Sequence, residues 1–173
     1  RGLEFFRKVV ALQRKYAKVG QRIENDLQTN GTLLDEDWAR FLKEHRFLVG
    51  LSIDGPKEIH DRYRRNRGGE PSFEAAMKGL RLLQKHGVNY NVLACVARET
   101  AYHPLEVYHF FKKERIEFIQ FTPVIERAAD EGSGKTGLRF AAPSVLDTEE
   151  PNTKVMQWTV EPEAYGDFLI AIY

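Results

Sequence analysis

Residues 47–64, FLVGLSIDGPKEIHDRYR, form the stretch that decides the fold of this chain. The stretch begins as an apolar run with the β-branched and aromatic content of a strand buried on both faces of a parallel sheet. Ser52 and Asp54 lie two residues apart, so their side chains are expected on one face at the carboxyl end of that strand. Gly55-Pro56 then ends the strand. Because ligands of α/β proteins bind at this end of the strands, the motif is the first place to look for function.

The composition bounds the class of protein. The chain has 173 residues, enough for one domain with a substantial core. Its 26 Lys and Arg residues against 25 Asp and Glu residues give a net charge of +1, which offers no reason to expect nucleic acid or a membrane as partner. No apolar run approaches the roughly 20 residues of a membrane span, and the N-terminus lacks signal-peptide architecture. We therefore predict a soluble, cytoplasmic protein with a single domain over residues 1–173.

The cysteine and histidine content indicates no metal site. Cys95 is the only cysteine, which excludes an internal disulfide and any multi-cysteine cluster built from this chain alone. Its position within a predicted buried strand indicates a core residue that behaves as a small hydrophobe. His60, His103 and His109 show no metal-ligand spacing with carboxylates, and loop or surface positions are favoured for them. No catalytic residue and no metal ligand is predicted here.

Helical and strand periods alternate along the chain. Helices are predicted over residues 3–18, 72–85, 104–113 and 163–173 and after the N-cap Asp35, and strands over residues 22–28, 47–53, 90–96, 116–124 and 155–160. Ser72 is the expected N-cap of the second of these helices, and Leu105 and Tyr108 are expected to face inward from the third. The order predicts an α/β fold with right-handed crossovers and a parallel sheet or partial barrel.

The alternation of helices and strands has one long gap, and it is incomplete at both ends of the chain. Residues 126–154 lose all periodicity, and a loop of that length is usually functional or mobile. The strands are too few to close an eight-stranded barrel, and the chain begins on a helix and stops inside one. We therefore expect a piece of a larger domain, truncated at both ends.

Five segments carry a resemblance to a known family. Their residues are 27–35 (LQTNGTLLD), 51–64 (LSIDGPKEIHDRYR), 91–99 (NVLACVARE), 103–112 (HPLEVYHFFK) and 117–127 (EFIQFTPVIER). Taken in order, they resemble consecutive segments of anaerobic sulfatase-maturating enzymes, which are radical S-adenosylmethionine (SAM) enzymes with a cysteine-rich C-terminal extension. The resemblance covers nearly the whole chain and is specific as a set. It implies a parallel-stranded, TIM-like partial (β/α)6 barrel, of which this chain is a central fragment beginning after the second strand.

The resemblance also implies cofactors, a reaction and partners. SAM and a four-iron four-sulfur cluster are implied, with the CxxxCxxC loop upstream of Arg1 and the auxiliary-cluster cysteines downstream of Tyr173. In the family, a deoxyadenosyl radical takes hydrogen from the β-carbon of a Cys or Ser in a sulfatase, and oxidation gives Cα-formylglycine. The implied partners are the sulfatase polypeptide and an external electron donor. Because one cysteine cannot ligate the cluster, this chain alone is expected to be inactive.

The resemblance assigns cofactor roles to individual residues. Ser52 matches a serine that bonds a ribose hydroxyl of SAM, and Asp54 would serve the same ribose. Arg64 matches an arginine on the SAM carboxylate, where a planar guanidinium binds bidentately. Ile125 matches a position whose backbone bonds adenine. The alternatives are turn chemistry for Ser52 and Asp54 and a solvated basic patch around Arg64.

Residues beyond the strand over 22–28 are candidates for substrate binding. Gln28 and Asn30 are expected at the cavity mouth, where they would bind adenosine or the substrate peptide, although Asn30-Gly31 is also a simple turn. Glu126 is a weaker candidate for substrate contact. The sequence GGEP at residues 68–71 spells a motif that this superfamily uses for the SAM amino group, but it follows the wrong strand, and a loop before a helix is favoured.

Two other functions fit the same residues. One is a different radical SAM peptide maturase with a cysteine-rich extension, because these residues do not specify which peptide is the substrate. The other is a barrel scaffold or binding module without a cluster.

Overall fold

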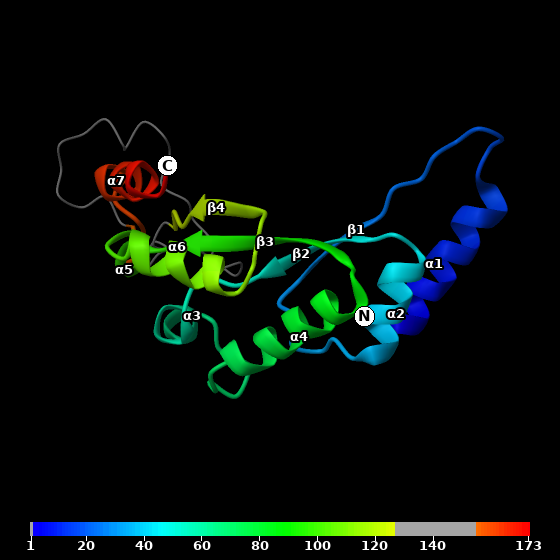
Figure 1. Ribbon diagram of the computed structural model, residues 1–173, viewed down its shortest axis with the longest axis horizontal. Helices are drawn as coiled ribbons and strands as arrows, with labels where there is room; N and C mark the ends of the chain where they lie inside the picture. The colour runs from blue at the N-terminus through cyan, green and yellow to red at the C-terminus, as the bar shows by residue number, and fades with distance from the viewer. Residues whose placement is uncertain (1, 127–154) are drawn as a thin grey trace, which may run out of the picture.

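The computed structural model describes residues 2–126 and 155–173 and is built around a four-stranded parallel sheet (Figure 1). Each strand pairs with the next one along the chain, in the order β1-β2-β3-β4. This sequential order is that of a barrel wall, because the strand order of a doubly wound sheet reverses at a switch point. The strands are β1 (Asp26–Thr29), β2 (Leu48–Ser52), β3 (Asn89–Val96) and β4 (Ile119–Pro123).

Helices connect successive strands, as the alternation of periods predicts. Those in the described residues are α1 (Leu3–Tyr16), α2 (Glu36–Glu44), α3 (Lys57–Tyr63), α4 (Phe73–His86), α5 (Arg98–Ala101), α6 (Pro104–Lys113) and α7 (Pro162–Ile172). Helices α1 and α2 meet at one end of the sheet, where the rings of Phe6 and Trp38 pack with centroids 5.3 Å apart, and α5, α6 and α7 gather at the other end (Figure 1). None of the described helices is long and apolar enough to cross a membrane.

One face of the sheet forms the core. Alternate residues of β2 and β3, with their extensions, are buried beneath the helices because side chains of a strand alternate between its faces. They are Val49, Leu51, Ile53, Val92, Ala94 and Val96. The core also includes Leu80, Leu83, Val107 and Phe111, which α4 and α6 supply.

The opposite face carries the other residues of the same strands. Gly50 lies between the side chains of Gln28 and Leu93, and an added Cβ there would come within 3.0 Å of Leu93 Cδ1 and 3.2 Å of Gln28 Cγ. Ser52 continues this face and is half-buried. Any side chain larger than glycine at position 50 would therefore push the side chains of this face apart.

Local signals set several element ends where the sequence predicts them. Asp35 caps α2, since its carboxylate accepts a hydrogen bond from Trp38 N at 2.9 Å. Gly87 ends α4 with a φ of 60°, the left-handed conformation that glycine adopts without strain. Ser72 occupies the N-cap position of α4, but its hydroxyl makes no cap. The carboxylate of Asp61 caps this helix instead, because it accepts hydrogen bonds from Ser72 N at 3.0 Å and from Phe73 N at 2.8 Å.

Several expectations about elements are wrong, including the start of the strand predicted at residue 116, which begins at Ile119. The first strand begins at Asp26, where pairing with Leu48 starts, rather than at residue 22. Residues 155–160 add no strand to the sheet, because a turn between Met156 and Thr159 interrupts them. Leu105 and Tyr108 are exposed, since the inward face of α6 is formed by Val107 and Phe111. The loop predicted over residues 126–154 lies outside the described residues, apart from Glu126.

Candidate functional site

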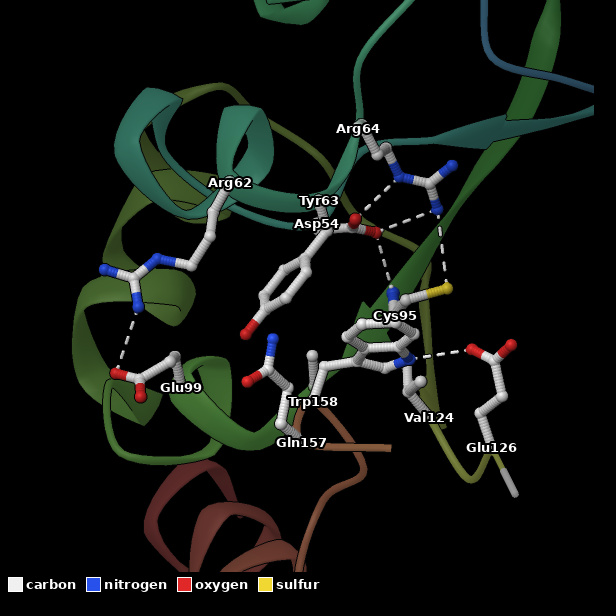
Figure 2. A pocket seen from close by; sticks show the side chains of 11 residues that line it. Asp54, Arg62, Tyr63, Arg64, Cys95, Glu99, Val124, Glu126, Gln157 and Trp158 are labelled. Atoms are coloured by element: carbon white, nitrogen blue, oxygen red, sulfur yellow. Dashed lines mark hydrogen bonds and ion pairs between the residues drawn. The ribbon is translucent and has the colours of Figure 1, made fainter. Parts of the chain in front are cut away.

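A cavity of about 830 Å³ opens at the carboxyl edge of the sheet (Figure 2). Its walls come from the segments that follow β2, β3 and β4 and from the segment before α7. The lining residues are Asp54, Arg62, Tyr63, Arg64, Cys95, Ala97, Glu99, Val124, Glu126, Gln157 and Trp158. The cavity therefore lies where ligands of parallel α/β proteins bind.

A bidentate ion pair joins two of the predicted site residues. Arg64 donates from Nε to Asp54 Oδ2 at 2.6 Å and from Nη2 to Asp54 Oδ1 at 2.9 Å. Helix α3 returns the chain from Asp54, just after β2, to Arg64 at its own C-terminal end. The Asp54 side chain is only 4% exposed and that of Arg64 25%. Burial works against the guanidinium charge, but hydrogen bonds to Asp54 outweigh it and raise the pKa of Arg64.

The same carboxylate ties β2 to β3. Asp54 Oδ1 also accepts from Cys95 N at 2.8 Å, and Arg64 Nη2 lies 3.4 Å from Cys95 Sγ. The prediction that Cys95 is a core residue is therefore wrong. The strand alternation places it on the face away from the helices, where it is half-buried and lines the cavity. Burial, with the nearby Asp54 carboxylate, raises the pKa of its thiol.

The ion pair leaves part of the Arg64 guanidinium unused. Among the described residues, no hydrogen bond reaches Nη1, which points away from Asp54 (Figure 2). A guanidinium presents donors on more than one edge, so Arg64 can keep its bond to Asp54 and still bind an anion in the cavity. A carboxylate or phosphate is the natural ligand for such a group.

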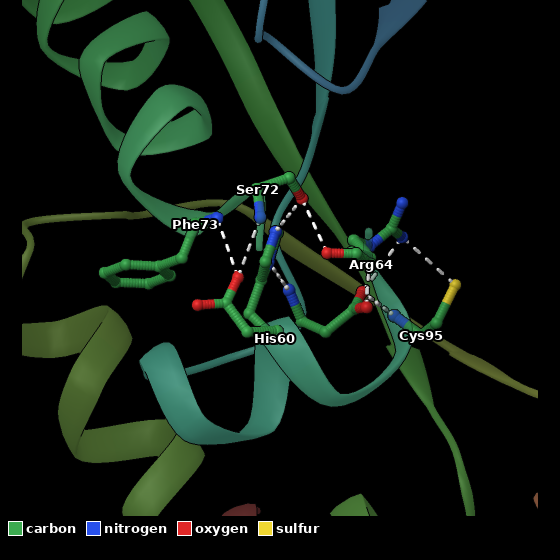
Figure 3. A network of polar contacts seen from close by, with 7 residues as sticks. His60, Arg64, Ser72, Phe73 and Cys95 are labelled. Carbon is green, nitrogen blue, oxygen red and sulfur yellow. Dashed lines mark hydrogen bonds and ion pairs between the residues drawn. The ribbon is translucent and has the colours of Figure 1, made fainter. Parts of the chain in front are cut away.

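His60 is buried, and the prediction of a loop or surface position is wrong. It lies in α3 and is 1% exposed. Asp54 N donates to its Nδ1 at 3.4 Å, and its Nε2 lies 3.2 Å from Ser72 Oγ (Figure 3). Ser72 Oγ in turn donates to the carbonyl of Arg64 at 2.8 Å. Burial lowers the pKa of His60 below its usual 6.5, although the Asp54 carboxylate acts in the opposite direction.

The lowered pKa predicts a dependence of stability on pH. Below 6.5 the unfolded state takes up a proton at His60 before the folded state does, so acidification favours unfolding. We expect the free energy of unfolding to fall as pH drops from 6.5 towards the lowered pKa, by at most about 1.4 kcal/mol per pH unit. Urea denaturation at a series of pH values measures this. His60→Gln should remove the component, whereas His109→Gln, at an exposed position of α6, should retain it.

Aromatic and polar residues close the other side of the cavity. Trp158 donates from Nε1 to Glu126 Oε2 at 2.7 Å, and Arg62 pairs with Glu99 at 3.1 Å (Figure 2). Thr159 Oγ1 donates to Glu126 O at 2.9 Å, so the two chain segments are held together. Sequence reasoning missed Tyr63 and Trp158. Tyr63 lies in the unpredicted helix α3, and Trp158 lies in a segment predicted to be a strand.

The remaining predicted residues lie outside this cavity. Ser52 ends β2 and makes no side-chain hydrogen bond with the described residues. Ile125 follows β4 and is 70% exposed, and its backbone has no hydrogen-bond partner in the part of the chain that the structure describes. Gln28 lies on the open face of β1. Asn30 stabilises the turn after β1 by accepting hydrogen bonds from Thr32 N and Oγ1.

The GGEP sequence forms a loop, as the sequence favours. Asn66 Oδ1 accepts hydrogen bonds from Gly68 N at 2.8 Å and Glu70 N at 3.0 Å. Arg65 and Pro71 form a bridge that closes the loop just before α4.

The family is decided by a match over most of the chain. Residues 3–111 match the model of the Radical SAM superfamily. The chain belongs to this superfamily. It is homologous to anaerobic sulfatase-maturating enzymes, with 43% identity over 173 residues to a serine-type enzyme of Bacteroides thetaiotaomicron and 45% over 130 residues to a cysteine-type enzyme of Clostridium perfringens. These alignments cover 100% and 75% of this chain but 40% and 35% of the relatives, so the radical SAM chain spans well under half of their length.

A solved radical SAM structure has the same fold. Native anSMEcpe with bound AdoMet and the Cp18Cys peptide matches with a TM-score of 0.81 and 37% identity, covering 99% of this chain and 42% of that one. The predicted partial-barrel fold is thereby confirmed. An iron-sulfur cluster does not fit the residues present, because the sequence has one cysteine and no group of three or more His, Cys, Asp or Glu in the described residues could hold a metal.

Proposed function

We propose that this chain is the central part of a radical SAM enzyme that oxidises an active-site Cys or Ser of a sulfatase to Cα-formylglycine. The observation that carries the proposal is Arg64, whose guanidinium is held by Asp54 at the carboxyl edge of the sheet and lines the cavity. The homologous sulfatase-maturating enzymes, and the similar structure with AdoMet and a peptide bound, support it.

The proposed SAM site uses residues at the end of β2, at the C-terminal end of α3 and after β4. Arg64 would bind the SAM carboxylate through the guanidinium edge that Asp54 leaves unused. Ser52 would bond a ribose hydroxyl with its own hydroxyl, and Ile125 would bond adenine through its backbone. A role of Asp54 at the ribose stays a prediction, since its carboxylate already accepts three hydrogen bonds.

The proposed substrate site extends from the cavity across the open face of the sheet to β1. Gln28, on the open face of the edge strand β1, and Asn30, in the turn after it, would contact the sulfatase peptide, with Glu126 on the opposite side. With one electron from the cluster, bound SAM would supply the radical that removes hydrogen from the β-carbon of the target Cys or Ser. The contribution of this chain is to hold SAM and to keep water away with the walls around Val124 and Trp158.

The ligands of the cluster and the electron donor would lie outside this chain. We propose that the cluster ligands belong to other parts of a longer protein, and that this chain alone is inactive. An external electron donor would supply electrons, and the cytoplasm would be the site of the reaction.

Calorimetric titration of the full-length, cluster-loaded protein with SAM tests the proposal. Arg64→Ala is expected to weaken SAM binding about 10- to 100-fold, because a charged hydrogen bond is worth about 1.5–3 kcal/mol. Ser52→Ala should weaken it about two- to tenfold. Arg40→Ala removes an arginine whose side chain is 61% exposed, and is the control that should leave binding unchanged.

The outcomes separate the candidate functions. If both Ser52→Ala and Arg64→Ala bind SAM as tightly as the unmodified protein, the proposed site is wrong. If the full-length protein binds no SAM at all, a scaffold or binding module is the better interpretation. Arg64→Lys helps where Arg64→Ala does not fold, because it keeps the charge and loses the planar fork.

A further inference from the structure

One buried imidazole connects the two residues that carry the ion pair of the cavity (Figure 3). His60 Nδ1 receives the backbone N–H of Asp54, where the chain leaves β2. Its Nε2 contacts Ser72 Oγ, and this hydroxyl donates to the backbone carbonyl of Arg64, where the chain leaves α3. Both members of the ion pair are therefore fixed at the backbone through one side chain.

Only one arrangement of protons satisfies these contacts. The backbone N–H of Asp54 is always a donor, so Nδ1 of His60 must be unprotonated. A neutral imidazole then carries its proton on Nε2 and donates it to Ser72 Oγ. The Ser72 hydroxyl has one hydrogen, which goes to the Arg64 carbonyl, a group that can only accept. An imidazolium would instead turn an N–H towards the N–H of Asp54.

We propose that His60, as the neutral Nε2–H tautomer, is a positioning residue for Arg64. The proposal rests on the function proposed above, in which Arg64 binds the SAM carboxylate. Asp54 fixes the guanidinium, and the His60–Ser72 pair fixes the backbone from which that side chain extends. Together the two anchors determine where the unused edge of the guanidinium lies in the cavity. His60 does not line the cavity, so it would act on the bound ligand only through Arg64.

The groups around His60 are compatible with a neutral ring. Charged neighbours are Lys57 and Asp61 on α3, Asp54 before it and Arg64 at its end, so two cations balance two carboxylates. The carboxylate of Asp61 is engaged at the N-terminus of α4, and its other oxygen accepts from Lys57 Nζ at 2.7 Å. From α4 itself, the ring of Phe73 packs edge-on at 5.7 Å between centroids.

Substitutions at His60 and Ser72 test the positioning role in the full-length, cluster-loaded protein. His60→Ala removes both contacts and is expected to weaken SAM binding about tenfold. His60→Gln places an amide donor near the former Nε2 and should restore part of that loss, and Ser72→Ala should weaken binding about three- to tenfold. The control is His109→Gln, an exposed position at which affinity should not change. A thermal melt of each variant identifies those that are folded at the titration temperature.

A second measurement needs no SAM. The 15N resonances of the histidine rings report which nitrogen carries the proton, and the resonances missing in His60→Gln identify His60. We expect an unprotonated Nδ1 and a protonated Nε2 at neutral pH. Observation of the Nδ1–H tautomer or of an imidazolium would overturn the proposal, because neither can accept from Asp54 N.

The two measurements separate failure of this proposal from failure of the proposed function. Unchanged SAM affinity in folded His60→Ala and Ser72→Ala, with binding lost in Arg64→Ala, overturns only the positioning role. Unchanged affinity in Arg64→Ala overturns the function on which that role rests. A graded loss from His60→Gln to His60→Ala, with the expected tautomer, supports the proposal.

Discussion

Asp54→Ala is expected to lower the free energy of unfolding by about 3–5 kcal/mol, because removing one partner of a buried ion pair leaves the other charge uncompensated. The Arg64 side chain is only 25% exposed, and the substitution also removes the acceptor of Cys95 N. Three hydrogen bonds disappear together at the point where β2, β3 and α3 meet. Urea denaturation monitored by far-UV circular dichroism measures the change.

An exposed ion pair of the same type provides the control. Asp37 pairs with Arg40 on α2, with side chains 65% and 61% exposed, and Asp37→Ala should change stability by no more than about 1 kcal/mol. In a double-mutant cycle, Asp54→Ala combined with Arg64→Ala should cost less than the sum of the single changes, since no unpaired charge remains. Equal losses in the free energy of unfolding for Asp54→Ala and Asp37→Ala would show that the buried ion pair stabilises the fold no more than the exposed one.

The fold could be predicted well wherever a local signal sets an element. Asp35, Gly87 and Pro104 mark helix ends through capping, left-handed geometry and a preset φ, and the structure uses all three in these positions. The continuous apolar runs of β2 and β3 identify them as strands of a parallel sheet. These signals act within a few residues, so they survive without knowledge of tertiary contacts.

The candidate site was predicted less completely because its contacts are long-range. Helix α3 is seven residues long and rich in charge, which hides its period. Without α3, nothing in the sequence shows that Arg64 returns to Asp54 or that His60 lies inside. The alternation in β3 did carry a signal for Cys95, since Val92, Ala94 and Val96 are the buried set and Cys95 is out of phase with them. The prediction of a core position treated the whole strand as buried and did not use this alternation.

Phe168→Ala is expected to lower the free energy of unfolding by about 3–5 kcal/mol, the range for truncating a buried aromatic side chain. Phe168 is fully buried and packs edge-to-face on Phe121 of β4, with ring centroids 5.2 Å apart. Helix α7 is further attached through Tyr165, whose hydroxyl donates to Phe121 O at 3.2 Å. Helix α7 packs mainly on α5 and α6 rather than on the strands, so hydrogen exchange should show it opening before β2 and β3 do. Ile170→Ala, at a side chain 78% exposed on the same helix, should change stability by less than about 0.5 kcal/mol.

Phe168→Ala should also affect the cavity wall that carries Trp158. The segment leading into α7 carries Trp158, whose backbone carbonyl accepts from Arg98 N at 3.0 Å, and Glu161, which pairs with Arg98 Nη1 at 2.8 Å. If Phe168 anchors this wall, Phe168→Ala should expose the Trp158 indole under conditions in which the sheet remains folded. Trp38→Phe leaves Trp158 as the single tryptophan, and in that background acrylamide should quench its fluorescence more strongly after Phe168→Ala. Quenching that stays the same while stability falls would mean that the Arg98 contacts hold the wall without help from α7.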